Sequence, residues 1–168
     1  MRYLSVLRHA KAERLEGYPN DKSRPLTARG VKDTSLMARL LARLDPAPTW
    51  IISSPAQRAQ QTAEGVSAAL PHDHQVILEE RVYDASAETL LSVLSEVPPE
   101  VDHAVIVGHN PSMAALVSGL CTGSADRLNI IMVTGALAYL ELEIAWWNQI
   151  RWGCGGLHML MKPKLLRE

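Results

Sequence analysis

The sequence predicts an α/β fold in which a mostly parallel sheet is covered by helices. Short apolar runs recur along the 168 residues, segments of helical periodicity separate them, and no internal repeat or domain linker interrupts the pattern. A chain of this length can bury roughly 70% of the surface that its unfolded form exposes. We therefore expect one domain spanning residues 1–168.

Five strands are expected from the apolar runs. They are 3–7, 50–53, 76–78, 104–107 and 135–143. The last run alternates apolar and polar residues over its second half, a pattern typical of a half-exposed edge strand. The following segment, 146–161, is compatible with one more strand. Within it, Gly153-Cys154-Gly155-Gly156 lacks the lysine and the following helix of a phosphate-binding P-loop and is interpreted as a loop.

Four helices are expected between the strands. The first covers 28–44, carries an apolar stripe of leucines and ends before Asp45-Pro46. The third follows Ser86 and continues to the prolines at 98–99. The fourth begins at Asn110-Pro111, a capping residue followed by a proline.

The second helix has the sharpest predicted start. Ser54 is the expected N-cap, Pro55 the first helical residue and Gln57 the third, which together spell a capping box. This start places Arg58 in the first helical turn, just beyond the strand that ends at residue 53. Its guanidinium can then reach the edge of the sheet where that strand ends.

Two histidines follow two of the apolar runs. His9 comes after residues 3–7 with Arg8 beside it, and His109 comes after residues 104–107. Open α/β sheets bind ligands beyond the carboxyl ends of their strands. Two histidines and an arginine at that edge indicate a phosphate pocket.

The residue types of this pocket suit phosphoryl transfer. Guanidinium groups match phosphate oxygens and stay charged, and Arg8, Arg58 and Arg24 are the candidates. A neutral imidazole is a competent nucleophile, and nearby arginines favour the neutral form. His9 is therefore the expected nucleophile, and His109 would donate a hydrogen bond to a phosphate oxygen in the transition state.

Four short motifs occur in order between residues 3 and about 118. They are Leu7-Arg8-His9-Ala10; Arg24-Pro25-Leu26-Thr27 with Gly30; Ser53-Ser54-Pro55 with Arg58, Ala59 and Thr62; and Val107-Gly108-His109-Asn110-Pro111. In this order they resemble the signatures of the histidine phosphatase, or phosphoglycerate mutase-like, superfamily. The short length and the Arg-Pro-Leu-Thr segment resemble its SixA-type phosphohistidine phosphatase branch.

The resemblance implies a three-layer αβα sandwich and a metal-independent phosphatase without a cofactor. Carried over by motif, His9 accepts the phosphoryl group, Arg8 and Arg58 grip phosphate, and His109 completes the pocket. Arg24 matches a position that SixA-type members also use near phosphate. The motif Leu7-Arg8-His9-Ala10 departs from the commonest pattern of the superfamily, which has glycine where Ala10 stands.

A general acid has no clear match in this chain. Larger members use a carboxylate to protonate the leaving oxygen, and Glu79, Glu80 and Asp84 follow the third strand. Glu80 is the candidate that we select. An imidazole leaves more easily than an alkoxide, so a missing acid favours phosphohistidine or aryl phosphate substrates over sugar phosphates.

Three other interpretations remain open. The chain could be a small-metabolite phosphomonoesterase or mutase of the same superfamily, or a phosphate-binding regulatory module without turnover. His72 and His74 flank Asp73 and could bind a metal, although Pro71 favours a surface loop there. The expected partner is a phosphorylated protein or a small phosphorylated metabolite, and the residues do not specify which, nor the oligomeric state.

Composition argues against two further classes of partner. The formal net charge is −1 and the basic residues are scattered, which is unlike a nucleic-acid surface. The tryptophans at 146, 147 and 152 lack interleaved basic residues and suit a core or a protein surface better than base stacking. Apolar runs fall short of the roughly 20 residues of a membrane span, and the N-terminus does not read as a signal peptide. A cytoplasmic location is expected.

Overall fold

The computed structural model describes residues 1–71 and 74–168. Within these residues, six strands form one sheet in the order β3-β2-β4-β1-β5-β6. The strands are β1 (Arg2–Arg8), β2 (Trp50–Ser53), β3 (Gln75–Leu78), β4 (His103–Gly108), β5 (Leu137–Leu142) and β6 (Gly155–Met161). Strands β3, β2, β4 and β1 pair in parallel, and β5 and β6 are added antiparallel.

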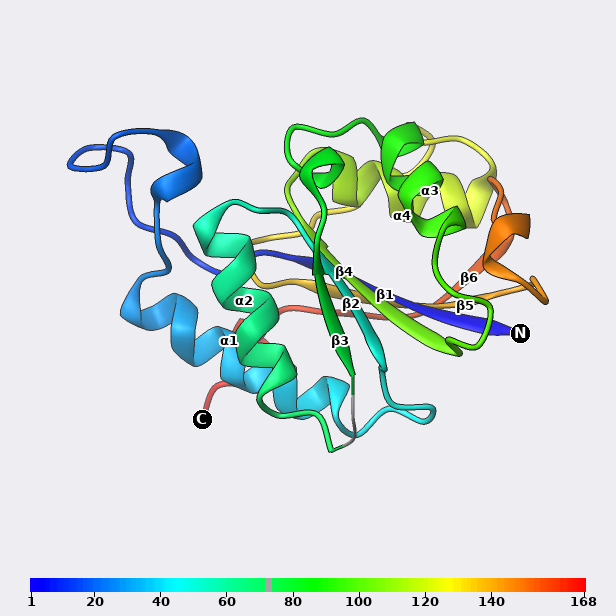
Figure 1. Cartoon of the computed structure of the whole chain (residues 1–168), viewed down its shortest axis with the longest axis horizontal. Helices are drawn as coiled ribbons and strands as arrows, with labels where there is room; N and C mark the ends of the chain where they lie inside the picture. Colours follow the sequence, from blue (N-terminus) through cyan, green and yellow to red (C-terminus); the bar gives the residue numbers. More distant parts are fainter. Residues whose placement is uncertain (72–73) are drawn as a thin grey trace.

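Helices cover both faces of this sheet. They are α1 (Ala28–Leu41), α2 (Gln57–Ser67), α3 (Ala87–Ser95) and α4 (Ser112–Thr122). Figure 1 shows α1 and α2 on one face and α3 and α4 on the other. This is the predicted three-layer αβα sandwich, and the prediction is confirmed.

Strand β4 shows why the sheet is buried on both sides. Ala104 and Ile106 belong to the core cluster beneath α3 and α4, whereas Val105 and Val107 belong to the cluster beneath α1 and α2. All six residues of β4 are buried. Because successive side chains point to opposite faces, a strand covered on both sides is a continuous apolar run, and this is the pattern seen in the sequence.

Two of the predicted helix starts are wrong. Helix α2 begins at Gln57 with Ala56 as its N-cap, because the Ser54 hydroxyl accepts from the Ala56 amide at 3.2 Å and so closes a turn two residues earlier. Helix α4 begins at Ser112, because the Asn110 side chain donates to the Met132 carbonyl at 2.8 Å instead of capping.

Helix α1 ends three residues earlier than predicted. Its last residue is Leu41, and the amides of Arg43 and Leu44 donate to the carbonyls three residues before them. Such bonds tighten the final turn into 3₁₀ geometry. The start of α3 after Ser86 is confirmed, and the helix ends at Ser95, ahead of the two prolines.

The second half of the sheet corrects two further predictions. Strand β5 is not an edge strand, because β6 pairs with its far side and leaves β5 buried between β1 and β6. Gly155 and Gly156, predicted to lie in a loop, are the first residues of β6. The polar position Glu141 of β5 has its carboxylate 3.2 Å from Nε2 of His158 on β6.

The parallel register fixes where the candidate residues lie. Strands β1 and β4 are neighbours, with Arg8 opposite Gly108, so the residues after them, His9 and His109, emerge side by side. Strand β2 is the next neighbour of β4 and leads directly into α2, which carries Arg58. Three separate segments of the chain therefore meet at one edge of the sheet. No helix among the described residues has the length and apolar character of a membrane span.

Candidate active site

His9 lies at the centre of this edge with its ring oriented by the backbone. The residue is 6% exposed, and its Nδ1 lies 2.8 Å from the Ala10 carbonyl oxygen. A carbonyl oxygen only accepts, so Nδ1 carries the ring proton and Nε2 keeps a lone pair. The Nε2 atom faces Nε of Arg58 at 3.3 Å. The His9 ring therefore presents an unprotonated nitrogen to the pocket.

The backbone around His9 is held from three sides. The His9 amide donates to the Gly108 carbonyl at 3.0 Å, and its carbonyl accepts from the Gly135 amide at 2.9 Å. The amide of Ala10 donates to the Thr62 hydroxyl of α2 at 3.1 Å. Strand, loop and helix therefore all fix the backbone turn that carries the imidazole.

His109 faces the same space. The ring centroids of His9 and His109 are 5.1 Å apart. Nη2 of Arg58 lies 3.3 Å from Nδ1 of His109, and Nε2 of His109 lies 2.8 Å from the Ser54 hydroxyl. Arginine only donates, so in this state Nδ1 of His109 accepts and Nε2 donates to Ser54. The serine predicted as a helix cap instead orients a histidine.

Arg58 joins the two histidines and is almost buried, at 5% exposure. Its Nε and Nη2 face His9 and His109, and its Nη1 and Nη2 also reach Asp21. The predicted position in the first turn of α2 is confirmed. The guanidinium therefore presents an edge with two donors to the space between the histidines.

Arg8 approaches from the end of β1. Its Nη1 donates to the Met132 carbonyl at 2.9 Å, while its Nε is buried without a partner among the described residues. Burial and the neighbouring Arg58 lower its pKa. An unused buried donor next to a second guanidinium is well suited to an anion.

In the part of the chain that the structure describes, the other two predicted residues make no hydrogen bond to His9 or His109. Arg24 directs all of its nitrogens to Asp21 and the Glu13 carbonyl, at 2.9 to 3.0 Å. Glu80 is paired with Lys22 at 3.3 Å, and its side chain is 77% exposed. The structure thus brings together His9, Arg8, Arg58 and His109 but leaves Glu80 in a solvent-facing ion pair.

Both pocket histidines are held neutral. Burial, opposed by the hydrogen bond to the Ala10 carbonyl and assisted by His109, Arg58 and Arg8, lowers the pKa of His9 to about 3. Burial and Arg58 lower the pKa of His109 to about 4, although the charge of Asp21 acts in the opposite direction. A neutral His9 at physiological pH is the form that can attack phosphorus.

Sequence reasoning missed Asp21 and Tyr83. The Tyr83 hydroxyl donates to Oδ2 of Asp21 at 2.7 Å, and its ring meets the His109 ring edge-on, with centroids 5.5 Å apart. Asp21 precedes Arg24, a predicted phosphate-binding residue, by three residues. That spacing is the one sequence signal that could have identified it.

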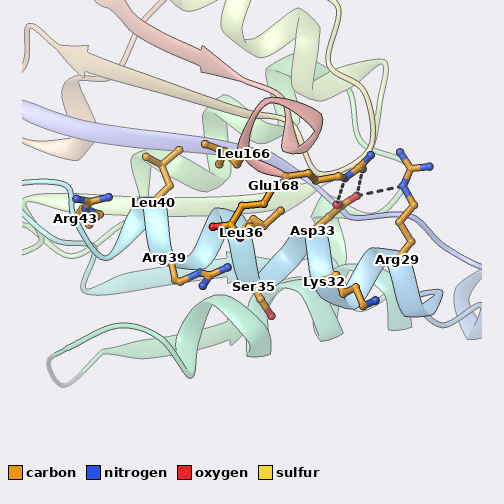
Figure 2. A pocket seen from close by; sticks show the side chains of 11 residues that line it. Arg29, Lys32, Asp33, Ser35, Leu36, Arg39, Leu40, Arg43, Leu166 and Glu168 are labelled. Carbon is orange, nitrogen blue, oxygen red and sulfur yellow. Dashed lines mark hydrogen bonds and ion pairs between the residues drawn. The ribbon is translucent and has the colours of Figure 1, made fainter.

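A separate cavity of about 990 Å³ lies between α1 and the 3₁₀ helix η4 (Pro163–Leu166). Figure 2 shows Asp33 there, joined to Arg29 by an ion pair. Asp33 also forms an ion pair with Arg167. None of the candidate site residues lines this cavity. Within the described residues, no three His, Cys, Asp or Glu side chains gather as a metal site. The alternative metal site at 72–74 includes residues 72 and 73, which lie outside the described residues.

Comparison with known proteins agrees with the motifs. The model of the histidine phosphatase superfamily (branch 1) matches residues 4–91. An uncharacterized protein of Mycobacterium leprae (strain TN) is 30% identical over 150 residues, which is 83% of this chain and 89% of that protein.

Solved structures show the same fold. The putative phosphohistidine phosphatase SixA from Agrobacterium tumefaciens superposes with a TM-score of 0.79 at 26% identity, covering 96% of this chain and 98% of that one. The protein histidine phosphatase SixA complexed with tungstate superposes with a TM-score of 0.82 at 24% identity, covering 98% and 99%.

Proposed function

We propose that this chain, which belongs to the histidine phosphatase superfamily (branch 1), is a phosphohistidine phosphatase that works through His9. The observation that carries the proposal is the orientation of His9. Its Nδ1 proton is committed to the Ala10 carbonyl, and its Nε2 lone pair faces the Nε of Arg58. Nε2 of His9 accepts from Nε of Arg58 at 3.3 Å, so a phosphoryl group whose oxygen takes over this donor would contact both the guanidinium and the freed lone pair.

In the first step, Nε2 of His9 attacks the phosphorus of the substrate. A P–N bond to His9 forms while the bond between phosphorus and the leaving nitrogen breaks, and the electron pair leaves with the substrate imidazole. Arg58 and Arg8 stabilise the charge on the equatorial oxygens. His109, as the neutral tautomer with its proton on Nδ1, would donate to one of these oxygens while its Nε2 accepts from the Ser54 hydroxyl.

In the second step, water attacks the phosphorus of phosphorylated His9. The P–N bond breaks and its electron pair returns to Nε2, which yields neutral His9 and dihydrogen phosphate. The Nδ1 proton stays on the ring throughout, because Nδ1 continues to donate its hydrogen bond to the Ala10 carbonyl. The enzyme is then ready for another cycle.

The leaving group decides which substrates this pocket can serve. A phosphohistidine whose second ring nitrogen is protonated releases a neutral imidazole, so its departure needs no acid from the enzyme. An alkoxide does need one. Asp21 is held ionised by Tyr83 and two arginines, and Glu80 is paired with Lys22 at the surface. This environment supports phosphohistidine, in preference to sugar phosphates, as the substrate. It also supports a phosphorylated protein as the molecule that carries the phosphohistidine.

We also propose that the reaction needs no metal. Arg8 and Arg58 supply two cationic groups beside His9, and the helices α2 and α4 begin at the same edge of the sheet. Charge neutralisation is the main requirement of phosphoryl transfer, and these groups provide it. We expect a chelator to leave turnover unchanged. Adding Mg²⁺ back afterwards should also leave turnover unchanged.

The test is a comparison of substrates. Inorganic phosphate release should be measured from a phosphohistidine-containing protein, from an aryl phosphate and from a panel of sugar phosphates. A general acid contributes about 10²- to 10⁴-fold, so the sugar phosphates should have a kcat/KM at least about 100-fold lower. Equal turnover of sugar phosphates would favour a small-metabolite phosphomonoesterase. Phosphate binding without release from any substrate would favour a regulatory module.

A further inference from the structure

Asp21 lies in the 3₁₀ helix η1 (Asp21–Ser23), in the loop that joins β1 to α1. Figure 1 shows this segment projecting beyond the strand ends that carry the two histidines. The Asn20 side chain caps η1 by accepting from the Ser23 amide at 3.0 Å. This cap gives the loop a local hydrogen-bonded structure at Asp21, the residue that reaches Arg58.

Both carboxylate oxygens of Asp21 are occupied. Oδ2 accepts from Nη2 of Arg58 at 2.9 Å and from the Tyr83 hydroxyl at 2.7 Å. Oδ1 accepts from Nε of Arg24 at 3.0 Å and lies 2.9 Å from its Nη2. The Asp21 backbone carbonyl accepts from Nη1 of Arg58 at 2.8 Å. One residue therefore holds two guanidinium groups and a phenol.

These contacts divide the donors of Arg58 between two sides. The outer side, made by Nη1 and one hydrogen of Nη2, is held by the backbone and side chain of Asp21. The inner side, made by Nε and the other hydrogen of Nη2, faces Nε2 of His9 and Nδ1 of His109, each at 3.3 Å. A guanidinium gripped on its outer edge can present only its inner edge to a ligand.

We propose that Asp21 is the residue that positions Arg58, fixing its Nε–Nη2 edge toward the phosphoryl group, and that Arg24 acts by holding Asp21. This inference rests on the proposed function of the same pocket. It assigns Arg24 a role different from the one carried over by motif, because each of its nitrogens is already directed to Asp21 or to the Glu13 carbonyl. Phosphate would contact Arg58 and Arg8, and Arg24 would support Arg58 through Asp21.

The charge state of Asp21 agrees with this role. The hydrogen bond from Tyr83, together with Arg58 and Arg24, holds the pKa of the Asp21 carboxyl well below its usual range. A carboxylate that stays ionised accepts hydrogen bonds and cannot serve as a proton donor. Asp21 is therefore a fixed anchor for the arginines and not the missing general acid.

Tyr83 extends the same network to the second histidine. Its hydroxyl donates to Asp21 while its ring packs edge-on against His109. The Lys22 ammonium lies over this ring, 4.7 Å from its centroid. Loss of Asp21 should therefore disturb the alignment of Arg58 most and that of His109 to a smaller extent.

The decisive variants are Asp21→Asn and Arg24→Lys, with Glu16→Gln as the matched control because it removes an exposed carboxylate from the same loop. Turnover of the phosphohistidine protein, its KM and the Kd for inorganic phosphate should be measured for each. Asp21→Asn should lower kcat about 10- to 100-fold, as expected for a misaligned catalytic group. KM and the phosphate Kd should change less than about threefold or become lower, because a negative charge has left the pocket.

Arg24→Lys separates the two roles of that arginine. If Arg24 holds Asp21, kcat falls while the Kd for inorganic phosphate stays within about threefold, because the phosphate contacts remain. If Arg24 contacts phosphate directly, the Kd and KM rise together and its part of the inference is overturned. The Glu16→Gln control should match the unaltered chain in all three measurements.

Two results would overturn the role of Asp21. One is an Asp21→Asn protein that is folded and has unchanged kcat. The other is an equal loss of kcat and phosphate affinity with a lower unfolding temperature, which would mean that Asp21 only maintains the loop. If Asp21→Asn does not fold, Tyr83→Phe removes one hydrogen bond to Asp21 and should lower kcat about two- to fivefold, with KM unchanged, as one hydrogen bond of about 0.5 to 1 kcal/mol implies. An unaltered chain that releases no phosphate from any substrate contradicts the proposed function instead.

Discussion

Buried histidines lie at both ends of the strand pair β1 and β4, and only one end forms a candidate site. His103 begins β4 and is fully buried, with its pKa lowered by burial to about 4. His9 follows β1 at the other end, with its pKa lowered to about 3. Burial and a depressed pKa are therefore common to both ends of the sheet.

The partners of the rings distinguish the two ends. The Pro46 carbonyl accepts from Nδ1 of His103 at 2.7 Å, and the Ser5 hydroxyl lies 2.9 Å from its Nε2. Both nitrogens of His103 are thus used within the fold. His9 has the same backbone bond on Nδ1, but its Nε2 faces Arg58. A buried histidine becomes a candidate catalyst when one nitrogen is fixed and the other faces a cationic pocket.

The largest expected effect is the loss of phosphate release when the candidate site at the His9 end of the strands is altered. His9→Ala should reduce phosphate release at least about 1000-fold, because the nucleophile is removed. Binding of inorganic phosphate should persist, since both arginines remain. Steady-state release from a phosphohistidine protein and calorimetric phosphate titration measure the two quantities. Retained turnover in His9→Ala would contradict the assignment of the nucleophile.

The next effect concerns the donor that joins the histidines. Arg58→Lys keeps a positive charge but cannot face His9, His109 and Asp21 together. We expect kcat/KM to fall about 100- to 1000-fold, as it does when a transition-state donor is lost. Kinetics at fixed ionic strength provide the measurement. A loss of less than about threefold would mean that charge alone is sufficient.

A substitution at the opposite end of the strands, at His103, should change the stability of the protein and not its activity. His103→Gln disturbs two buried hydrogen bonds and should lower the free energy of unfolding by about 1 to 3 kcal/mol. Turnover should stay within about threefold, because His103 lies at the other end of the strands. Denaturant unfolding measures the stability, and phosphate release from the same preparation measures the turnover. A selective loss of turnover would remove the distinction between the two ends.

A smaller effect appears in the pH dependence of stability, to which both ends contribute. The pKa values of His9, His103 and His109 are lowered to about 3, 4 and 4. Between about pH 4 and 6.5 the unfolded chain therefore binds more protons than the folded one, and stability rises with pH. Each histidine adds a slope of at most about 1.4 kcal/mol per pH unit.

This pH dependence can be dissected with the same variants. His103→Gln and His9→Ala should each reduce the slope by similar amounts, because the two rings are similarly buried and similarly depressed in pKa. Urea unfolding at several pH values between 4 and 7 gives the slope. A slope that is unchanged in both variants would show that these histidines do not titrate differently in the folded and unfolded chain.

The sequence was most informative where the sheet is regular. Because β1 and β4 are continuous apolar runs in a parallel sheet, the residues that follow them had to meet at one edge, and His9 and His109 do so. The position of Arg58 was predictable for a related reason, since it lies one residue into a helix that directly follows β2. The topology of the sheet alone therefore brings these three separate segments of the chain together.

Prediction failed where a side chain had two possible partners. Ser54 and Asn110 are residue types that commonly cap helices, yet Ser54 contacts His109 and Asn110 contacts the Met132 carbonyl. Local propensity cannot anticipate such long-range partners. The same limit hid Asp21, whose partners Arg58 and Tyr83 are 37 and 62 residues away. The Glu80 assignment stays a prediction, and the ion pair with Lys22 gives it no support.

The most direct test of the account is to trap the covalent intermediate. The chain should be mixed with a ³²P-labelled phosphohistidine protein, quenched under denaturing alkaline conditions within the first turnover, and mapped by peptide sequencing. We predict label on His9 that is stable to alkali and lost in acid, and no label in His9→Ala. Label on another residue, or substrate turnover with no labelled intermediate at any quench time, would contradict it.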